Sequence, residues 1–127
     1  MSRDLPPLSD TQLEIMNLIW QRGEASVSDV WKALAERRPV ARNTIHTLIV
    51  RLEEKGWLTH REDAGFLYAA TVSQEDAQRQ TVQRLIDTVF AGSAEELVLT
   101  LLASGAVSRP ELERIRKQIE TAKRKPS

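Results

Sequence analysis

Residues 40–57, VARNTIHTLIVRLEEKGW, decide the fold because they carry an apolar face and a polar face on one short segment. The aliphatic residues of this segment repeat with the i, i+3, i+4, i+7 spacing of a single helix face. They are Ile45, Leu48, Ile49 and Leu52. Gly56 is a suitable residue to end such a helix, since it adopts a left-handed backbone without strain. The segment therefore predicts a helix over about 42–55 whose aliphatic seam packs into a core.

The opposite face of this helix predicts contact with DNA. Its side chains are short, polar or basic, namely Arg42, Asn43, Thr44, His46, Thr47 and Arg51. Asn pairs bidentately with adenine, Thr can donate, accept or touch a thymine methyl, and an Arg further along is placed for a phosphate. From Arg37 to Leu52 the chain has four arginines and no acid. Chance clustering of arginines and an ordinary solvated helix face are the alternatives at this point.

Two capping boxes precede this helix. Ser9 with Gln12 predicts a helix over about 10–21, and Ser26 with Asp29 predicts another over about 27–37. Pro39 then disfavours helical geometry at the residue before it, which separates the second helix from the third. The first helix has a stripe expected to face the core, made of Leu13, Met16, Ile19 and Trp20.

After the third helix, the β-favouring runs WLTHRED (57–63) and GFLYAATV (65–72) lie around Asp63-Ala64-Gly65, which suits a tight hairpin. Three helices followed by a hairpin is the chain order of a winged helix-turn-helix. Arg61, beside the hairpin tip, is predicted to contact a phosphate or the minor groove. We expect residues 1–72 to form a winged-helix DNA-binding domain.

Residues 73–127 predict three more helices, capped at Ser73, Ser93 and Ser108. The middle one is apolar nearly all round, and about 50 residues are too few for a confident core of their own. Association of two copies would bury this surface, whereas packing back on the N-terminal domain is the alternative. The fold class expected is mainly α with a small β-hairpin wing, followed by a helical dimerisation domain. Its predicted dimer interface comprises Phe90, Leu97, Val98, Leu101, Leu102, Ile115 and Ile119.

The composition of the whole chain excludes several functions. Lys+Arg and Asp+Glu both total 18, and the absence of cysteine rules out disulfides, thiolate metal ligands and cysteine nucleophiles. The N-terminus has no apolar core of signal-peptide length, and no apolar run is long enough for a membrane span, so we expect a cytoplasmic protein without membrane insertion. The only histidines, His46 and His60, have no catalytic or metal-binding companions at a plausible spacing. We expect no catalytic residue, metal or cofactor. A winged-helix module that binds protein instead of DNA is the alternative that zero net charge leaves open.

The segments TIHTLIVRLEEKGWL and REDAGFLYAA resemble the recognition helix and wing of the BlaI/MecI/CopY family of bacterial transcriptional repressors, the penicillinase repressor family. That family's pattern, Thr-aliphatic-x-Thr-x-aliphatic-x-Arg-Leu-x-x-Lys-Gly, is matched in register from Thr44 to Gly56. LSDTQLEIMNLIW is similar to its first helix and VFAGSAEELVLTLL to its dimerisation helices. The resemblance implies a homodimeric repressor on a palindromic DNA operator, released when a membrane-bound metalloprotease sensor cuts the C-terminal domain.

Three features of the chain differ from the family's pattern. Arg42 and Asn43 occupy positions that vary widely in the family, so the operator sequence is not implied. The family's cleavage position falls between Asn and Phe, and the corresponding pair here is Thr100-Leu101. The copper-responsive branch uses a C-terminal cysteine motif, which this cysteine-free chain does not have. Operator, regulated genes and inducing signal are therefore not predicted.

Overall fold

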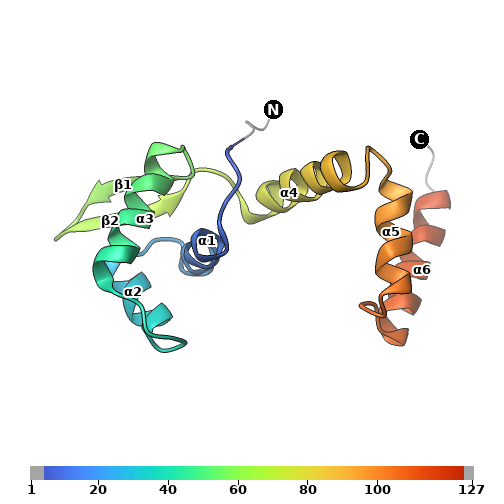
Figure 1. Ribbon diagram of the computed structural model, residues 1–127, viewed down its shortest axis with the longest axis horizontal. Coiled ribbons are helices and arrows are strands. Elements are labelled where there is room, and N and C mark those ends of the chain that lie inside the picture. Colours follow the sequence, from blue (N-terminus) through green and yellow to red (C-terminus); the bar gives the residue numbers. More distant parts are fainter. Residues whose placement is uncertain (1–4, 125–127) are drawn as a thin grey trace. The chain divides into compact units, whose positions relative to one another are not determined.

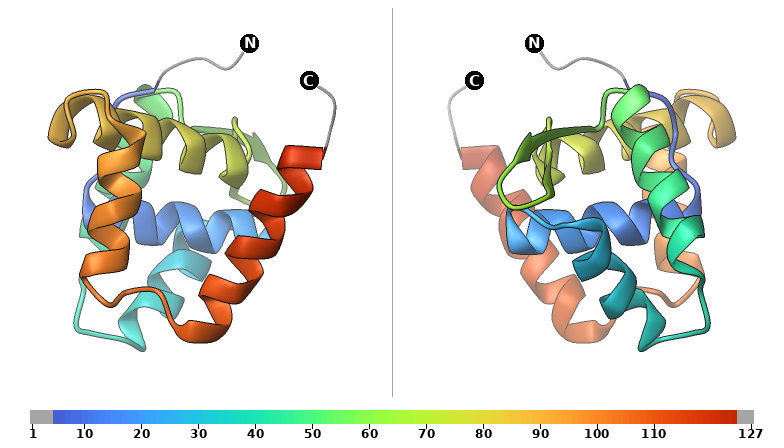
Figure 2. Two further views of the ribbon diagram at one scale, coloured as in Figure 1. Left: turned by 90° about the vertical axis from the view of Figure 1, so that its right-hand side faces the viewer. Right: turned by 90° about the vertical axis from the view of Figure 1, so that its left-hand side faces the viewer.

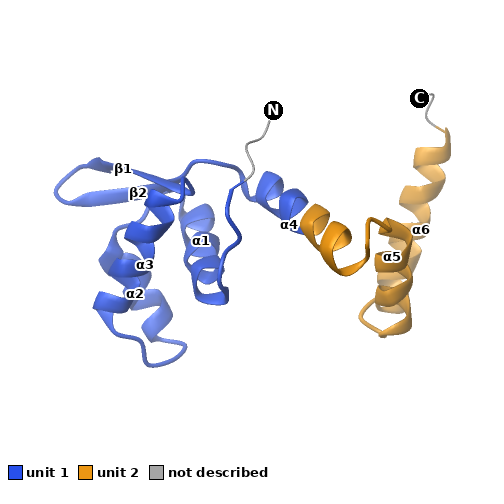
Figure 3. Cartoon of the chain, turned by 45° about the horizontal axis from the view of Figure 1, so that its top comes forward, with its two compact units in different colours: residues 1–81 blue, residues 82–127 orange. Residues whose placement is uncertain are grey.

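The computed structural model describes residues 5–124, which form six helices and one hairpin (Figure 1). These elements are α1 Asp10–Arg22, α2 Val27–Ala35, α3 Arg42–Glu54, β1 Leu58–Glu62, β2 Phe66–Ala70, α4 Gln74–Val89, α5 Ala94–Ala103 and α6 Arg109–Arg124. The predicted class, mainly helical with a β-hairpin wing, is confirmed. The chain divides into two compact units, 1–81 and 82–127, which meet within α4 (Figure 3). The predicted domain boundary after Val72 lies just before that helix.

Both capping boxes predicted for α1 and α2 are present. Ser9 Oγ accepts from the Gln12 amide at 3.2 Å while Gln12 Oε1 accepts from the Ser9 amide at 3.0 Å. Ser26 and Asp29 exchange the same pair of bonds at 3.0 and 3.1 Å. The α2 helix ends at Ala35, earlier than the predicted residue 37. The reason is that the amides following it donate to the Leu34 carbonyl and close a turn ahead of Pro39.

The core of unit 1 is built around the aliphatic seam of α3. Ile45, Ile49 and Leu52 are each 0% exposed, and the side chains packed with them come from α1, α2 and the hairpin. The principal members of this group are Ile15, Met16, Ile19, Val30, Leu34, Trp57, Leu58 and Tyr68. One core prediction is wrong, because Leu13 is 44% exposed. The buried face of α1 instead includes Gln12 and Ile15. The capping box pairs the Gln12 backbone amide and its side-chain oxygen with Ser9.

The hairpin is attached to the rest of unit 1 along one edge. The β1 and β2 strands pair antiparallel with His60 opposite Tyr68, and the tip turns at Ala64 and Gly65, both with positive φ. Ala25 exchanges two backbone hydrogen bonds with Tyr68, at 2.8 and 3.0 Å. Figure 2 shows the hairpin beside the segment that joins α1 and α2. This second pairing anchors the wing to the helical part of the unit.

Three indole groups tie connecting segments to the helices. Trp31 Nε1 donates to the Val40 carbonyl, ahead of α3, and Trp20 Nε1 donates to the Val72 carbonyl, ahead of α4. Trp57 Nε1 donates to the Pro6 carbonyl in the N-terminal segment. All three bonds are 2.9 Å long. Since backbone carbonyls at these turns have no helical partner, the indoles satisfy acceptors while their rings add to the core.

Unit 2 has very little interior of its own. Among its described residues, 82–124, only Ile86 is buried, and α5 and α6 contain no buried residue. In Figure 2 these two helices diverge from the loop that joins them. No helix within residues 5–124 combines the length and the apolarity needed to cross a bilayer.

We expect Ile49→Ala to lower the free energy of unfolding of unit 1 by about 2–5 kcal/mol, since it leaves a cavity in a fully buried seam. Urea denaturation followed by tryptophan fluorescence measures this change, because all three tryptophans lie in unit 1. Val50→Ala, an exposed neighbour on the same helix, is the control and should change stability by no more than about 0.5 kcal/mol. Equal losses for the two variants would contradict the assignment of the seam.

Candidate nucleic-acid interface

The α3 helix presents its predicted reading residues on one exposed face. Arg42, Asn43, Thr44, His46, Thr47 and Arg51 are all exposed. The seam of the same helix is fully buried, so the helix has no freedom to rotate this face inward without exposing Ile45, Ile49 and Leu52. The structure thus brings the residues predicted for base and phosphate contact together on a single surface.

The N-terminus of α3 differs from those of the other helices in residues 5–124. Its cap residue, Ala41, makes no side-chain hydrogen bond, and its first turn contains no acid. Each of the other five helices carries at least one Asp or Glu in its first turn. The positive end of the α3 dipole is therefore not compensated by a side chain, which favours an anion at this end of the helix.

Two arginines of the acid-free stretch are paired in space with an acid from α1. The Arg38 guanidinium donates to both Glu14 carboxylate oxygens at 2.6 and 2.9 Å, and to Thr11 Oγ1 at 3.2 Å. Arg37 lies 3.9 Å from the same carboxylate. The hydrogen bonds from Arg38 hold the pKa of Glu14 below its usual value. These contacts fix the turn before α3, and they leave Arg42 and Arg51 as the arginines of this stretch without an ion pair to a described residue.

Arg61 on the wing is engaged with acids of its own unit. Its guanidinium donates to the two Glu24 oxygens at 2.7 and 2.8 Å and to Asp63 at 3.4 Å. The hydrogen bond with Glu24 is the main cause that raises the pKa of Arg61 and lowers that of Glu24. A phosphate at Arg61 would therefore have to share or displace the Glu24 carboxylate.

A second contact joins the wing to the C-terminal end of α3. His60 Nδ1 lies 2.5 Å from Glu53 Oε2. The imidazole stacks on Phe66, with ring centroids 4.4 Å apart. Glu53 is thereby turned to the wing and away from the reading face, so only Glu54 remains as an unpaired exposed acid at the end of α3.

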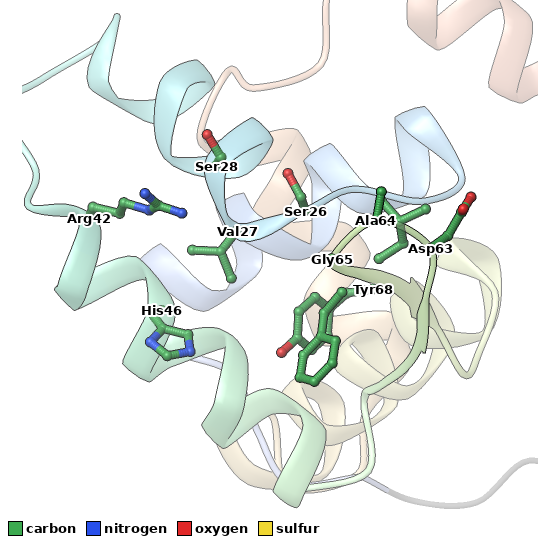
Figure 4. Close-up of a pocket in the computed structure, with 11 residues that line it drawn as sticks. Ser26, Val27, Ser28, Arg42, His46, Asp63, Ala64, Gly65 and Tyr68 are labelled. Carbon is green, nitrogen blue, oxygen red and sulfur yellow. The ribbon is translucent and has the colours of Figure 1, made fainter.

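A groove lies between the start of α2, the first half of α3 and the wing tip (Figure 4). Its volume is about 360 Å³. The side chains around it include Ser26, Ser28, Arg42, His46, Asp63 and Tyr68. Sequence reasoning identified Arg42 and His46, but it missed Ser28 and Tyr68, because no sequence spacing links them to α3. No group of three or more possible metal-binding side chains occurs in residues 5–124.

The sequence pattern of the family described as "Penicillinase repressor" matches residues 8–121. The chain belongs to the penicillinase repressor family. The methicillin resistance regulatory protein MecI of Mammaliicoccus sciuri is 31% identical over 110 residues, which cover 86% of this chain and 89% of MecI. The penicillinase repressor of Bacillus licheniformis is 26% identical over 122 residues, covering 95% of each chain. The members of this family are repressors and not enzymes, which confirms the prediction of a non-enzymatic protein.

Solved structures show the winged-helix fold of the penicillinase repressor family. The DNA-binding domain of the repressor BlaI, solved in solution, has a TM-score of 0.52 and 30% identity, covering 59% of this chain and 93% of that one. The monomeric form of Bacillus licheniformis BlaI, solved with the blaP half-operator, has a TM-score of 0.51 and 32% identity, covering 57% and 90%. Oxidised MarR from E. coli, at 14% identity and a TM-score of 0.51, shares the fold over 91% of this chain and 75% of its own.

We expect Glu24→Gln to tighten binding to random-sequence duplex DNA, because it releases the Arg61 guanidinium from its partner. The slope of log K against log salt should become more negative by about one, because one more counterion is released on binding. The control is Glu75→Gln, which makes the same charge change at an exposed acid that starts α4 and forms no ion pair with a described residue. Identical gains for both variants would mean that only net charge matters and that Arg61 takes no part.

Proposed function

We propose that the protein is a homodimeric DNA-binding transcriptional repressor that reads an inverted-repeat operator through α3. The observation that carries this proposal is the exposed polar face of α3 opposite a fully buried seam. Membership of the penicillinase repressor family, with a BlaI relative solved on its half-operator, supports the same function.

We assign base contacts to the N-terminal half of α3 and phosphate contacts to its flanks. Asn43 and Thr47 point away from the seam, with Thr44 and His46 beside them, so these short side chains meet base edges in the major groove. Arg42 and Arg51 are the cations placed for phosphates on either side. Arg61 on the wing contacts a further phosphate when its guanidinium is shared between that phosphate and the Glu24 carboxylate. Glu54 requires that the C-terminal end of α3 tilt away from DNA, as in helix-turn-helix docking.

The partner of unit 2 is, we propose, a second copy of the chain. Val98, Leu101 and Leu102 on α5 are 53, 43 and 46% exposed, an apolar surface that unit 2 leaves uncovered. On α6 the residues Leu112, Ile115 and Ile119 follow the narrow a/d spacing of a helix-pairing seam. Phe90 and Leu97 are partly buried at the margin of this surface. A dimer places two copies of α3 on half-sites one helical turn, or a multiple, apart.

We extend the proposal to the release of the repressor by proteolysis. Thr100-Leu101 lies in the last turns of α5, where both residues are exposed. Cleavage there would separate α6 from the rest of the proposed dimer surface, and a membrane-bound metalloprotease sensor is the proposed partner. Because the pair is helical, α5 would have to unwind locally before a protease could bind it as an extended strand.

A winged-helix module that binds protein is the second candidate, and specific observations favour it. The chain is neutral, and Arg37, Arg38 and Arg61 are all paired with acids of their own unit. Such a module would have little attraction for DNA at any salt concentration. Titration with DNA therefore separates the two candidates.

We expect the protein to bind duplex DNA with log K falling linearly as log salt rises, and to bind its palindromic site more tightly than random duplex. Thr47→Ala should lower the binding free energy for the palindrome by about 1–3 kcal/mol and relax the preference at one base pair. Arg51→Ala should weaken binding to all DNA sequences alike. Fluorescence anisotropy with a duplex selected from random DNA measures these affinities.

The full chain at low salt is the reference for this test. Negligible affinity for every duplex would reject the repressor function in favour of protein binding. If Thr47→Ala lowers affinity equally on the selected and random duplexes, the base-reading assignment of Thr47 is wrong.

Placing a charge in α5 tests the dimer. Leu101→Asp or Leu102→Asp should give a monomer in sedimentation velocity and weaken binding to the palindrome, because a carboxylate would be buried in an apolar interface. Thr121→Asp, on the face of α6 opposite its apolar seam, is the control and should remain dimeric. A Leu101→Asp protein that sediments as a dimer would exclude the proposed surface.

A further inference from the structure

Tyr68 on β2 is a buried side chain with an unused polar group. The residue is only 3% exposed, yet its hydroxyl makes no hydrogen bond to any described residue. No fully buried side-chain nitrogen or oxygen in residues 5–124 is left unpaired, so this oxygen must reach the surface of the groove. In Figure 4 the hydroxyl of Tyr68 points toward α3 across the groove. A buried ring that delivers an unpaired donor to a surface groove suits a ligand that accepts a hydrogen bond.

The start of α2 supplies further donors to the same groove. The capping box of this nine-residue helix uses the amide of Asp29, and Val30 bonds to the Ser26 carbonyl. The amides of Val27 and Ser28 have no acceptor among the described residues, as expected for the first turn of a helix. Ser28 also lines the groove, and its hydroxyl is likewise without a described partner.

The third wall of the groove is basic. Arg42 and His46, one turn apart on α3, line it, and neither forms an ion pair with a described residue. Asp63 is the acid of the lining, but it lies at the wing tip and is paired with Arg61 at 3.4 Å. Asp29 accepts from the Ser26 amide, so its carboxylate is engaged within the cap. Two basic side chains, together with the hydroxyl and amide donors of the residues that line the groove, thus favour an anion.

Tyr68 can donate a hydrogen bond to such an anion only if its hydroxyl keeps its proton. Burial, and then the nearby Glu53 carboxylate, raise the pKa of Tyr68 above its usual value. The hydroxyl is therefore protonated at neutral pH and offers its hydrogen to an acceptor.

We propose that this groove is a built site for one phosphodiester of the DNA backbone, held by the Tyr68 hydroxyl, the first turn of α2 and Arg42. The inference rests on the proposed function, because the ligand belongs to the same DNA whose bases α3 reads. A backbone phosphate fits better than a free one for a geometric reason. The groove adjoins the base-reading face of α3, and the strands that border a major groove run beside any helix placed in it. Tyr68 and Ser28 then set the depth and angle at which α3 enters.

Tyr68→Phe tests the site, because it removes only the hydroxyl. We expect affinity to fall about tenfold on selected and random duplexes alike, as for the loss of a hydrogen bond to a charged group. The salt dependence should stay unchanged, since no charge is removed, whereas Arg42→Ala should lower the salt slope by about one ion. A scan with single neutral methylphosphonates on the selected duplex should find one position at which wild type and Tyr68→Phe bind equally well.

Thr59→Val is the matched control, because Thr59 lies on β1 with its side chain on the opposite face of the hairpin from His60 and Tyr68. It should bind every duplex as wild type does. Urea denaturation of Tyr68→Phe should show an unchanged midpoint, which separates a lost contact from a lost fold.

Two results would overturn the phosphate site while leaving the repressor function intact. One is a Tyr68→Phe protein that binds as tightly as wild type, or loses affinity at one base pair only. The other is a methylphosphonate scan in which no position removes the difference between wild type and Tyr68→Phe, together with Tyr68-dependent binding of inorganic phosphate. Phosphate binding is measured by NMR, with chloride at equal ionic strength as the control. This result would assign the groove to a free anion. If the wild-type chain binds no duplex at all, it is the proposed function that fails.

Discussion

Burial of the α3 seam is the constraint on which the rest of the molecule depends. Ile45, Ile49 and Leu52 are inaccessible to water, and each contributes about 1.5–3 kcal/mol by leaving it. A helix held by three such residues has one permitted rotation about its axis. The polar face is therefore displayed as a consequence of packing, and no separate interaction is needed to hold it outward. Loss of the seam would remove both the fold of unit 1 and the presentation of its reading residues.

Electrostatics in this protein act by local pairing more than by total charge. The arginines Arg37, Arg38 and Arg61 neutralise Glu14 and Glu24 within unit 1. Arg42 and Arg51 remain on α3, whose N-terminus is not compensated by an acid. Such a surface has weak long-range attraction for DNA, so affinity has to come from base contacts, closely placed phosphate contacts and the joint action of two half-sites. Splitting the proposed dimer would then abolish binding efficiently.

The polar groups carried by the largely buried aromatic rings of unit 1 divide into those that complete the fold and one that does not. Trp20, Trp31 and Trp57 each donate to a backbone carbonyl of a connecting segment. The hydroxyl of Tyr68 has no such acceptor within the described chain. Because this hydroxyl is the surface-facing end of an otherwise buried ring, it is placed to donate to a ligand in the groove.

The sequence by itself determined the helices, their caps and the hairpin, because these follow from short-range periodicity and local hydrogen bonding. Ser9, Ser26 and the seam of α3 are where local patterns predicted them. Tertiary structure alone decided that Leu13 is exposed, that Arg61 is paired with Glu24 and that Tyr68 faces Arg42 across a groove. Those facts depend on contacts between residues far apart in the chain, and no periodicity encodes them. The reading face of α3 was predictable, since one helix carries it, but the groove beside it is assembled from three elements and appears only when the core brings them together.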